Sequence, residues 1–265
     1  MRLPADVCQV TQTFLARAGE RRPGLIQALY LHGSLGFGEY FPGCSDVDFV
    51  AILAARPDDA DLDALADVHA QTRAAHPQLR FEGCHLLRCD LARSPAQCPD
   101  VPYAFEGAFG RSGRFSINPV TWHELAWHGI TVRGPELTED DVWTDASALR
   151  AFTRVNLSSY WANVAEAQVK MPAEAAKPAA VAWCVLGVSR LHHLLAKGSI
   201  TSKSGAGRHA LSAFGPQWHP IVHEALRARE QPDAPSAYGD DTDRRGRDAT
   251  AFTAMAIQAG LALRP

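Results

Sequence analysis

The sequence lacks a long apolar run, a paired-cysteine motif and an excess of basic charge. No segment is apolar over roughly 18 residues and no signal-peptide pattern occurs, so we expect a cytoplasmic protein without a membrane segment. The six cysteines show no C-x-x-C spacing, which argues against a zinc site or a disulfide framework. A net charge of −3 gives no basic field, and binding to a nucleic-acid backbone depends on clustered Lys and Arg.

What the chain does have is enough apolar material for a full core. Its 265 residues are 46% hydrophobic, which suffices for one large domain or two modest ones. Strand-like runs occur in the first half, whereas the second half shows none as clear. We therefore expect an α+β protein, with a mixed-sheet domain over residues 1–148 and an all-helical bundle domain over residues 149–265.

Two apolar runs in the first half carry polar residues at their ends. The first run stops at Gly33 and Ser34, which predicts a buried strand whose end approaches something closely, since glycine has no side chain. The second begins with Ser45-Asp46-Val47-Asp48. Residues two apart in a strand share a face, so Asp46 and Asp48 point the same way. Such paired carboxylates repel unless a cation lies between them, and their hard oxygens suit Mg²⁺.

The combination of these two runs is more specific than either alone. A Gly-Ser turn by itself is typical of a loop, and Asp-x-Asp by itself is typical of a solvated strand edge. A strand before Gly33-Ser34, eleven residues to Ser45 and an apolar strand after Asp48 together resemble the signature of the nucleotidyltransferase superfamily. That resemblance implies a polymerase-β-like fold for the first domain.

A third apolar run, residues 79–87, contains one acidic residue, Glu82. A lone Glu in a strand usually faces solvent, but the resemblance implies a third carboxylate on the strand beside the Asp pair. It therefore implies that Asp46, Asp48 and Glu82 bind metal and that Glu82 takes a proton from the attacking hydroxyl. Mg²⁺ in such a site neutralises a triphosphate and its leaving pyrophosphate.

Glycine and hydroxyl groups beside these carboxylates are the expected phosphate contacts. Gly33 would let the backbone approach the nucleotide, and Ser34 and Ser45 would hydrogen-bond phosphate oxygens through hydroxyl or backbone N–H groups. Ordinary turn chemistry explains the two serines equally well. Residues 93–119, rich in Pro, Gly and Ser, predict a loop-heavy region whose aromatic residues line a substrate cleft or pack locally.

The second half contains a further pair of candidates, Arg190 and Lys203. Apolar residues recur at helical spacing over 152–164, 181–195 and 250–263, whereas 231–248 predicts a polar linker. An expected helix end at Ser189-Arg190 and a Lys thirteen residues after the Arg resemble the C-terminal domain of aminoglycoside 3''/9 adenylyltransferases. Arg190 and Lys203 are thereby implied to contact the ATP phosphates. Surface charges that compensate helix dipoles are the alternative.

The same family resemblance implies that Asn118 lies near the nucleotide, where the family often has Asp. This sequence also differs from the family pattern at two positions that would bind the acceptor. Ala180 stands where the family carries an acidic residue that binds the cationic drug, and Phe109 is the nearest candidate for the family's Trp. Because aminoglycosides are polycations, Glu106, Glu166 or Glu174 would have to supply the missing carboxylate.

The sequence thus predicts a magnesium-dependent enzyme that transfers AMP from ATP, bound between the two domains, to a hydroxyl group and releases pyrophosphate. Its expected acceptor is an aminoglycoside-like antibiotic such as spectinomycin or streptomycin, which would confer antibiotic resistance. Alternatives are another small metabolite, a protein side chain, or a non-catalytic nucleotide-binding interaction module. We expect a monomer whose partners are ATP and a small polar acceptor, with no nucleic acid.

Overall fold

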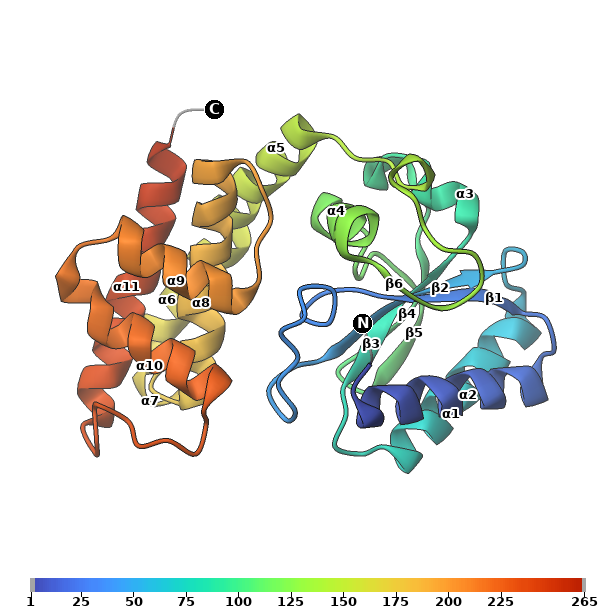
Figure 1. Cartoon of the computed structure of the whole chain (residues 1–265), viewed down its shortest axis with the longest axis horizontal. Helices are drawn as coiled ribbons and strands as arrows, with labels where there is room; N and C mark the ends of the chain where they lie inside the picture. Colours follow the sequence, from blue (N-terminus) through green and yellow to red (C-terminus); the bar gives the residue numbers. More distant parts are fainter. Residues whose placement is uncertain (1–2, 264–265) are drawn as a thin grey trace. The chain divides into compact units, whose positions relative to one another are not determined.

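The computed structural model describes residues 3–263, which form two compact units (Figure 1). The first unit extends to Thr144 and the second begins at Asp145. The sequence placed this boundary between residues 148 and 149. The first unit contains a β-sheet with helices, and the second contains helices.

A six-stranded mixed sheet forms the centre of the first unit. Its strands are β1 (Ile26–Leu31), β2 (Val47–Leu53), β3 (Phe81–Leu86), β4 (Val101–Phe105), β5 (Ala108–Gly113) and β6 (Ile130–Arg133). Their order is β5-β4-β3-β2-β1-β6. Only β2 and β3 pair in parallel, because a helix connects them across one face, and the other paired strands of the sheet run antiparallel.

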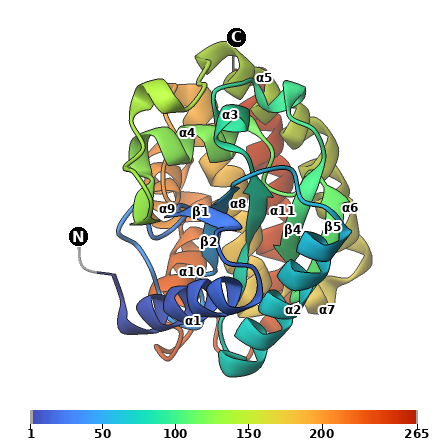
Figure 2. The same cartoon turned by 90° about the vertical axis from the view of Figure 1, so that its right-hand side faces the viewer.

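Helices cover both faces of this sheet. On one face lie α1 (Ala5–Arg21) and α2 (Asp59–Ala75), and Figure 2 shows them side by side. On the other face lie the short α3 (Arg88–Leu91) and α4 (Pro119–His128), together with 3₁₀ turns at Pro95–Gln97 and Glu139–Asp141 (Figure 1). The unit is therefore a three-layer arrangement with the sheet in the middle.

Strand alternation divides the interior into two apolar clusters. Leu29, Leu31 and Phe49 pack toward α1 and α2. Tyr30 and Val50, at the positions between them, pack toward α3 and α4 with Trp122 of α4. Even-numbered residues of β1 and β2 therefore point to the α4 side of the sheet, which fixes the side on which Asp48 lies.

The expectation of a loop-heavy region over residues 93–119 was wrong, because β4 and β5 form a hairpin there. Its two-residue turn has positive φ at Glu106 (49°) and Gly107 (73°), as tight hairpins require. Gly110 gives space to a neighbour instead of breaking the strand, since a Cβ there would lie 2.3 Å from Cζ of Tyr103. The glycines thus reflect packing across the hairpin.

The second unit is helical throughout its described residues, which confirms the predicted class. Its helices are α5 (Ala146–Asn156), α6 (Ala162–Lys170), α7 (Pro172–Ala175), α8 (Pro178–Lys197), α9 (Lys203–Ala213), α10 (His219–Glu230) and α11 (Thr242–Ala262). A π-helical turn, Leu157–Trp161, joins α5 to α6, and a 3₁₀ turn at Pro216–Trp218 precedes α10.

Helix α8 is the core of this bundle. It contacts α9, α10 and α11, and it ends at Gly198 in the left-handed region (φ 77°). By length and apolar composition alone it is the one described helix that could cross a membrane, but 56% of that stretch is buried inside the protein. Its apolar character is therefore explained by packing against the other helices.

The predicted polar linker over residues 231–248 was also wrong in part, since α11 begins at Thr242. Asp241 caps the helix by accepting a hydrogen bond from a backbone N–H of its first turn. Arg245 is buried and lies 3.6 Å from the carboxylate of Glu224 on α10. Arg245, which looked like a solvated linker residue, is thus partnered inside the bundle.

Two histidines are buried among aromatic rings beneath the sheet. His69 of α2 and His85 of β3 are joined by an Nε2–Nε2 hydrogen bond of 3.2 Å. Burial lowers the pKa of His69 well below its ordinary value and that of His85 to about 4. Both side chains are therefore neutral at physiological pH, one donating and the other accepting.

This pair predicts a pH-dependent stability. Below pH 6.5 these two histidines take up protons in the unfolded chain and stay neutral in the folded one, so their contribution to the free energy of unfolding should be level above that pH. It should fall from 6.5 toward 4 by about 1.4 kcal/mol per pH unit for each histidine that stays neutral. Urea titrations at several pH values measure this slope.

The His69→Leu/His85→Leu double variant removes both groups from an apolar site and should flatten the slope. His223→Leu is the control, because His223 is exposed. An unchanged slope in the double variant would contradict the assignment.

Candidate active site

Asp48 and Glu82 face each other on adjacent strands. The parallel register of β2 and β3 pairs Asp48 with Glu82, and both side chains fall on the α4 side of the sheet. Glu82 is only 7% exposed. The structure therefore brings together the two carboxylates that the sequence placed on neighbouring strands, and Glu82 does not face solvent.

Asp46 lies immediately before β2 and makes an ion pair with Arg80, the residue before β3. The two strand starts are also joined by the backbone, because the N–H of Val47 donates to the carbonyl of Arg80 at 2.8 Å. The carboxylate of Asp46 is thus neutralised by a guanidinium beside the other two acidic groups.

The end of β1 approaches Asp48 so closely that only glycine fits. Gly33 has φ 62°, and a Cβ on it would lie 2.1 Å from Oδ2 of Asp48. The preceding N–H, that of His32, donates to the carbonyl of Asp48 at 3.1 Å. The close approach predicted for Gly33 is therefore present, and the group that it accommodates is the Asp48 carboxylate.

The two candidate serines are in different situations. Oγ of Ser34 is buried and has no hydrogen-bond partner among the described residues. Oγ of Ser45 accepts a hydrogen bond from the N–H of Phe41 at 3.1 Å, which closes the turn before β2. A buried hydroxyl without a partner costs free energy, so Ser34 is the serine whose hydroxyl a ligand would satisfy.

The electrostatics of the site centre on Glu82. Burial first, and then the nearby carboxylates of Asp46 and Asp48, raise the pKa of Glu82 to about 7. The N–H of Glu106 donates to Oε1 of Glu82 at 3.1 Å and acts in the opposite direction. Near neutral pH this side chain therefore exchanges between acid and carboxylate, as a general base requires.

The residues fit a divalent cation, although its ligands are not already gathered around one point. Within residues 3–263, no three His, Cys, Asp or Glu side chains form a ready-made metal group, and Asp46 is directed to Arg80. Adjacent carboxylates that disfavour each other's charge are nevertheless the donors that Mg²⁺ prefers. A cation would replace the Arg80 guanidinium as the partner of Asp46.

A buried polar pair beside the site was missed from the sequence. Nδ1 of His32 and Oε2 of Glu124 lie 2.9 Å apart, and each residue is about 95% buried, with exposures of 4% and 5%. This contact joins the end of β1 to α4. The signal was available, because a His directly precedes Gly33 and a Glu interrupts the apolar face of α4.

Asn118 has a structural explanation. It is the N-cap of α4, and its Oδ1 accepts hydrogen bonds from the N–H groups of Val120 at 2.9 Å and Thr121 at 3.1 Å. The nucleotide contact implied by the family resemblance therefore stays a prediction.

The aromatic residue beside Glu82 is Phe105, not Phe109. The ring of Phe109 lies on the α2 side of the sheet, 5.5 Å from His69. Extending the β3–β4 register by one residue places Phe105 opposite Glu82. Its ring is 4.5 Å from that of Phe115, and Phe105 is 39% exposed. Because this region was expected to be a loop, the prediction did not use the alternation of side chains that places Phe105 and Phe109 on opposite sides of the sheet.

Arg190 and Lys203 belong to the helical unit. Arg190 is half-buried, and α8 continues beyond it to Lys197, so the expected helix end at Arg190 was wrong. Lys203 is the first residue of α9, whose N-cap is Ser202. A cation at a helix N-terminus is unfavourable to the dipole, so dipole compensation explains neither residue.

Comparisons with known proteins agree with this architecture. Residues 150–253 match the family model described as the aminoglycoside adenylyltransferase C-terminal domain. No curated protein matches the sequence. The structure is similar to that of spectinomycin adenyltransferase AAD(9) from Enterococcus faecialis, solved with ATP and spectinomycin, with a TM-score of 0.65 at 12% identity. The similarity covers 93% of this chain and 98% of that chain.

The fold is thus similar to that of AAD(9), and the predicted α+β class, a mixed-sheet domain followed by a helical domain, is confirmed. Over residues 150–253 the helical unit is similar, more narrowly, to the C-terminal domains of aminoglycoside adenylyltransferases. This confirms the family resemblance stated from Arg190 and Lys203.

The close approach of Gly33 to Asp48 predicts the effect of one methyl group. Gly33→Ala should weaken Mn²⁺ binding in the presence of a non-hydrolysable ATP analogue by about tenfold, or about 1.4 kcal/mol, because the Cβ would occupy the position of Oδ2. Electron paramagnetic resonance measures free Mn²⁺ in such a titration.

Gly43→Ala is the matched control, since Gly43 also has positive φ (76°) but a Cβ there would meet nothing within 4 Å. Alanine at either position costs about 1–2 kcal/mol of backbone strain, so the comparison separates the effect of the contact with Asp48 from that of the strain. Equal Mn²⁺ affinity in the two variants would refute the close-approach argument.

Proposed function

We propose that the protein is an ATP-dependent aminoglycoside-type adenylyltransferase that transfers AMP from ATP to a hydroxyl of a small polar acceptor. The observation that carries this proposal is the pairing of Asp48 with a buried Glu82 on the same side of the sheet. The family of the helical unit supports the same activity. A binding module would have no use for a buried carboxylate with a pKa of about 7.

In this proposal Glu82 accepts the proton of the acceptor hydroxyl. The oxygen then attacks the α-phosphorus of ATP, the bond to the pyrophosphate oxygen breaks, and pyrophosphate leaves with the electron pair. Asp46, Asp48 and Glu82 would hold Mg²⁺. Bound there, the cation would neutralise charge on the phosphates as it develops.

The nucleotide contacts that we propose begin with a hydroxyl group that has no hydrogen-bond partner in the fold. The hydroxyl of Ser34, buried without a partner, would donate to a phosphate oxygen. Arg190 and Lys203 would supply positive charge to the triphosphate, as the family resemblance implies. Gly33 and the Ser45 turn would shape the backbone around these groups, and the contact of Asn118 with the nucleotide is part of the same proposal.

The acceptor we propose is spectinomycin first and streptomycin second. Spectinomycin is bound in the structurally similar AAD(9). Helix α8, which has Ala180 where the family has an acid, contains no Asp or Glu. Glu174 is occupied by an ion pair with Lys177 at 2.6 Å, whereas Glu106 is exposed beside Glu82. A weakly cationic acceptor therefore suits the site better than a strongly cationic one.

A different small metabolite or a protein side chain is the alternative acceptor for the same chemistry. The net charge of −3 gives no reason to expect nucleic acid. We also propose that the protein acts as a monomer in the cytoplasm.

Separating nucleotide binding from turnover tests the reaction. Because Gln keeps an oxygen donor for the cation, Glu82→Gln should weaken ATP binding in Mg²⁺ no more than Asp48→Asn does. At saturating ATP it should still lower pyrophosphate release with spectinomycin by at least about 10²-fold, the usual contribution of a general base. Asp48→Asn should weaken Mg²⁺-dependent ATP binding itself. Calorimetry and a coupled pyrophosphate assay give the two measurements.

Asp63→Asn is the matched control, because Asp63 is an exposed carboxylate that pairs with Arg111 outside the site. It should behave as wild type in both assays. An active Glu82→Gln variant would remove the base assignment, and wild-type protein without turnover on spectinomycin or streptomycin would remove these acceptors.

Phe105 is expected to contact the acceptor and not ATP. Its ring is 39% exposed opposite Glu82, so Phe105→Ala should raise KM for the acceptor by about tenfold, as loss of a stacking face does. KM for ATP should change by less than about twofold. Phe109→Leu, on the other side of the sheet, should leave both KM values unchanged. A rise in KM for ATP alone would contradict this placement.

A further inference from the structure

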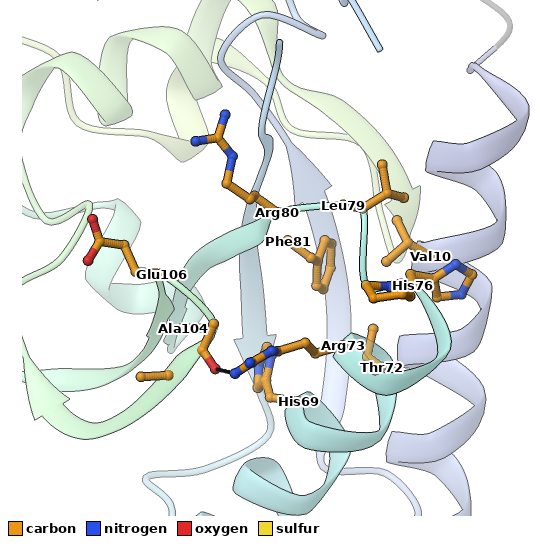
Figure 3. A pocket seen from close by; sticks show the side chains of 13 residues that line it. Val10, His69, Thr72, Arg73, His76, Leu79, Arg80, Phe81, Ala104 and Glu106 are labelled. Atoms are coloured by element: carbon orange, nitrogen blue, oxygen red, sulfur yellow. Dashed lines mark hydrogen bonds between the residues drawn. The ribbon is translucent and has the colours of Figure 1, made fainter. Parts of the chain in front are cut away.

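A cavity in the first unit is not explained by the proposed reaction. It has a volume of about 360 Å³ and lies between the end of α2, the start of β3 and the β4–β5 turn (Figure 3). None of Asp46, Asp48 and Glu82 lines it. Its size is within the range of about 300–1,000 Å³ typical of small-molecule sites.

The walls of this cavity are apolar on one side and cationic on another. Val10, Leu79 and Phe81 present apolar and aromatic surface. Two guanidinium side chains, Arg73 and Arg80, line it together with a single carboxylate residue, Glu106. A ligand that combines an apolar body with a negative group matches this distribution.

Arg73 is positioned across the cavity. Its side chain extends from α2 toward the β4–β5 turn (Figure 3), where Nη1 donates to the carbonyl of Gly107 at 2.7 Å. One bond of this kind orients the exposed guanidinium and leaves further N–H groups of the fork for a ligand, since arginine has five N–H donors. The cavity therefore offers a guanidinium donor beside its apolar wall.

We propose that this cavity binds a small organic anion, a carboxylate attached to an aromatic or other apolar ring. The carboxylate pairs with the guanidinium of Arg73, and the ring lies against Phe81 and Leu79. Arg80, whose stem lines the same cavity, joins the carboxylate when it leaves Asp46.

This site is coupled to the active site through two contacts. Arg80 pairs with Asp46, and the turn residue Glu106 donates its N–H to Glu82. An anion that attracts Arg80 frees Asp46 for a cation, and a cation on Asp46 frees Arg80 for the anion. The coupling, which rests on the proposed function of Asp46, is reciprocal by thermodynamic linkage.

Calorimetry on the wild-type protein tests the anion site without any turnover. The probes are 6-bromo-2-naphthoate and its neutral analogue 6-bromo-2-naphthalenemethanol. The acid should bind at least about tenfold more tightly than the alcohol, as a charge-assisted pair requires. Equal affinity, or no binding of the acid at millimolar concentration, would overturn the proposal.

Matched charge reversals locate the binding. Arg73→Glu should lower the affinity for the naphthoate by at least about tenfold. Arg111→Glu should leave it unchanged, because Arg111 is an exposed arginine of the same unit that pairs with Asp59 and Asp63 and does not line the cavity. Equal losses in the two variants would indicate a general charge effect and overturn the site.

Anomalous scattering from bromine in a soaked crystal of the wild-type protein gives the position even if Arg73→Glu fails to fold. Bromine beside Phe81 supports the site, and bromine elsewhere overturns it. Mg²⁺ with a non-hydrolysable ATP analogue should tighten naphthoate binding by about threefold or more. An unchanged affinity overturns the coupling. Because binding is read without catalysis, absence of adenylyl transfer would refute the proposed function and not this site.

Discussion

Repulsion between one buried and two half-buried carboxylates is the constraint on which the candidate site depends. The sheet pairs Asp48 with Glu82 and places Asp46 beside them. Removing like charges from water while holding them together is unfavourable, so the fold must supply positive charge or leave a proton bound. Both occur: Arg80 pairs with Asp46, and the pKa of Glu82 rises to about 7. A divalent cation would satisfy the same requirement, which is why the arrangement suits phosphoryl chemistry.

The three central strands of the sheet and the positions of their carboxylates could be predicted from the sequence, because these depend on short-range patterns. The alternation of side chains along a strand determines the face of the sheet on which Asp48 lies, and the apolar runs located β1, β2 and β3. A close approach of some group to Gly33 was predictable, because glycine has no side chain. The identity of that group, Asp48, was not predictable, since the β1–β2 pairing that brings it there is a tertiary contact.

The errors share a physical cause, which is that partners distant in the sequence changed the meaning of local signals. Gly110 read as a loop signal, but it makes room for Tyr103 on the paired strand. Arg245 read as a linker charge, but it reaches Glu224 within the bundle. The pair of His32 and Glu124 required knowing that α4 returns to the end of β1. No window of sequence contains those contacts.

The parallel register between β2 and β3 also limits how this gene can change. Side chains alternate along a strand, so one codon inserted between the start of β3 and Glu82 would turn the carboxylate toward α1 and α2, among Phe49 and Phe14. An insertion of two codons would return the Glu82 carboxylate to its original side of the sheet but would move it away from Asp48. Length variation among descendants of this sequence is therefore expected in the exposed segment before β3, where an extra residue leaves the register intact.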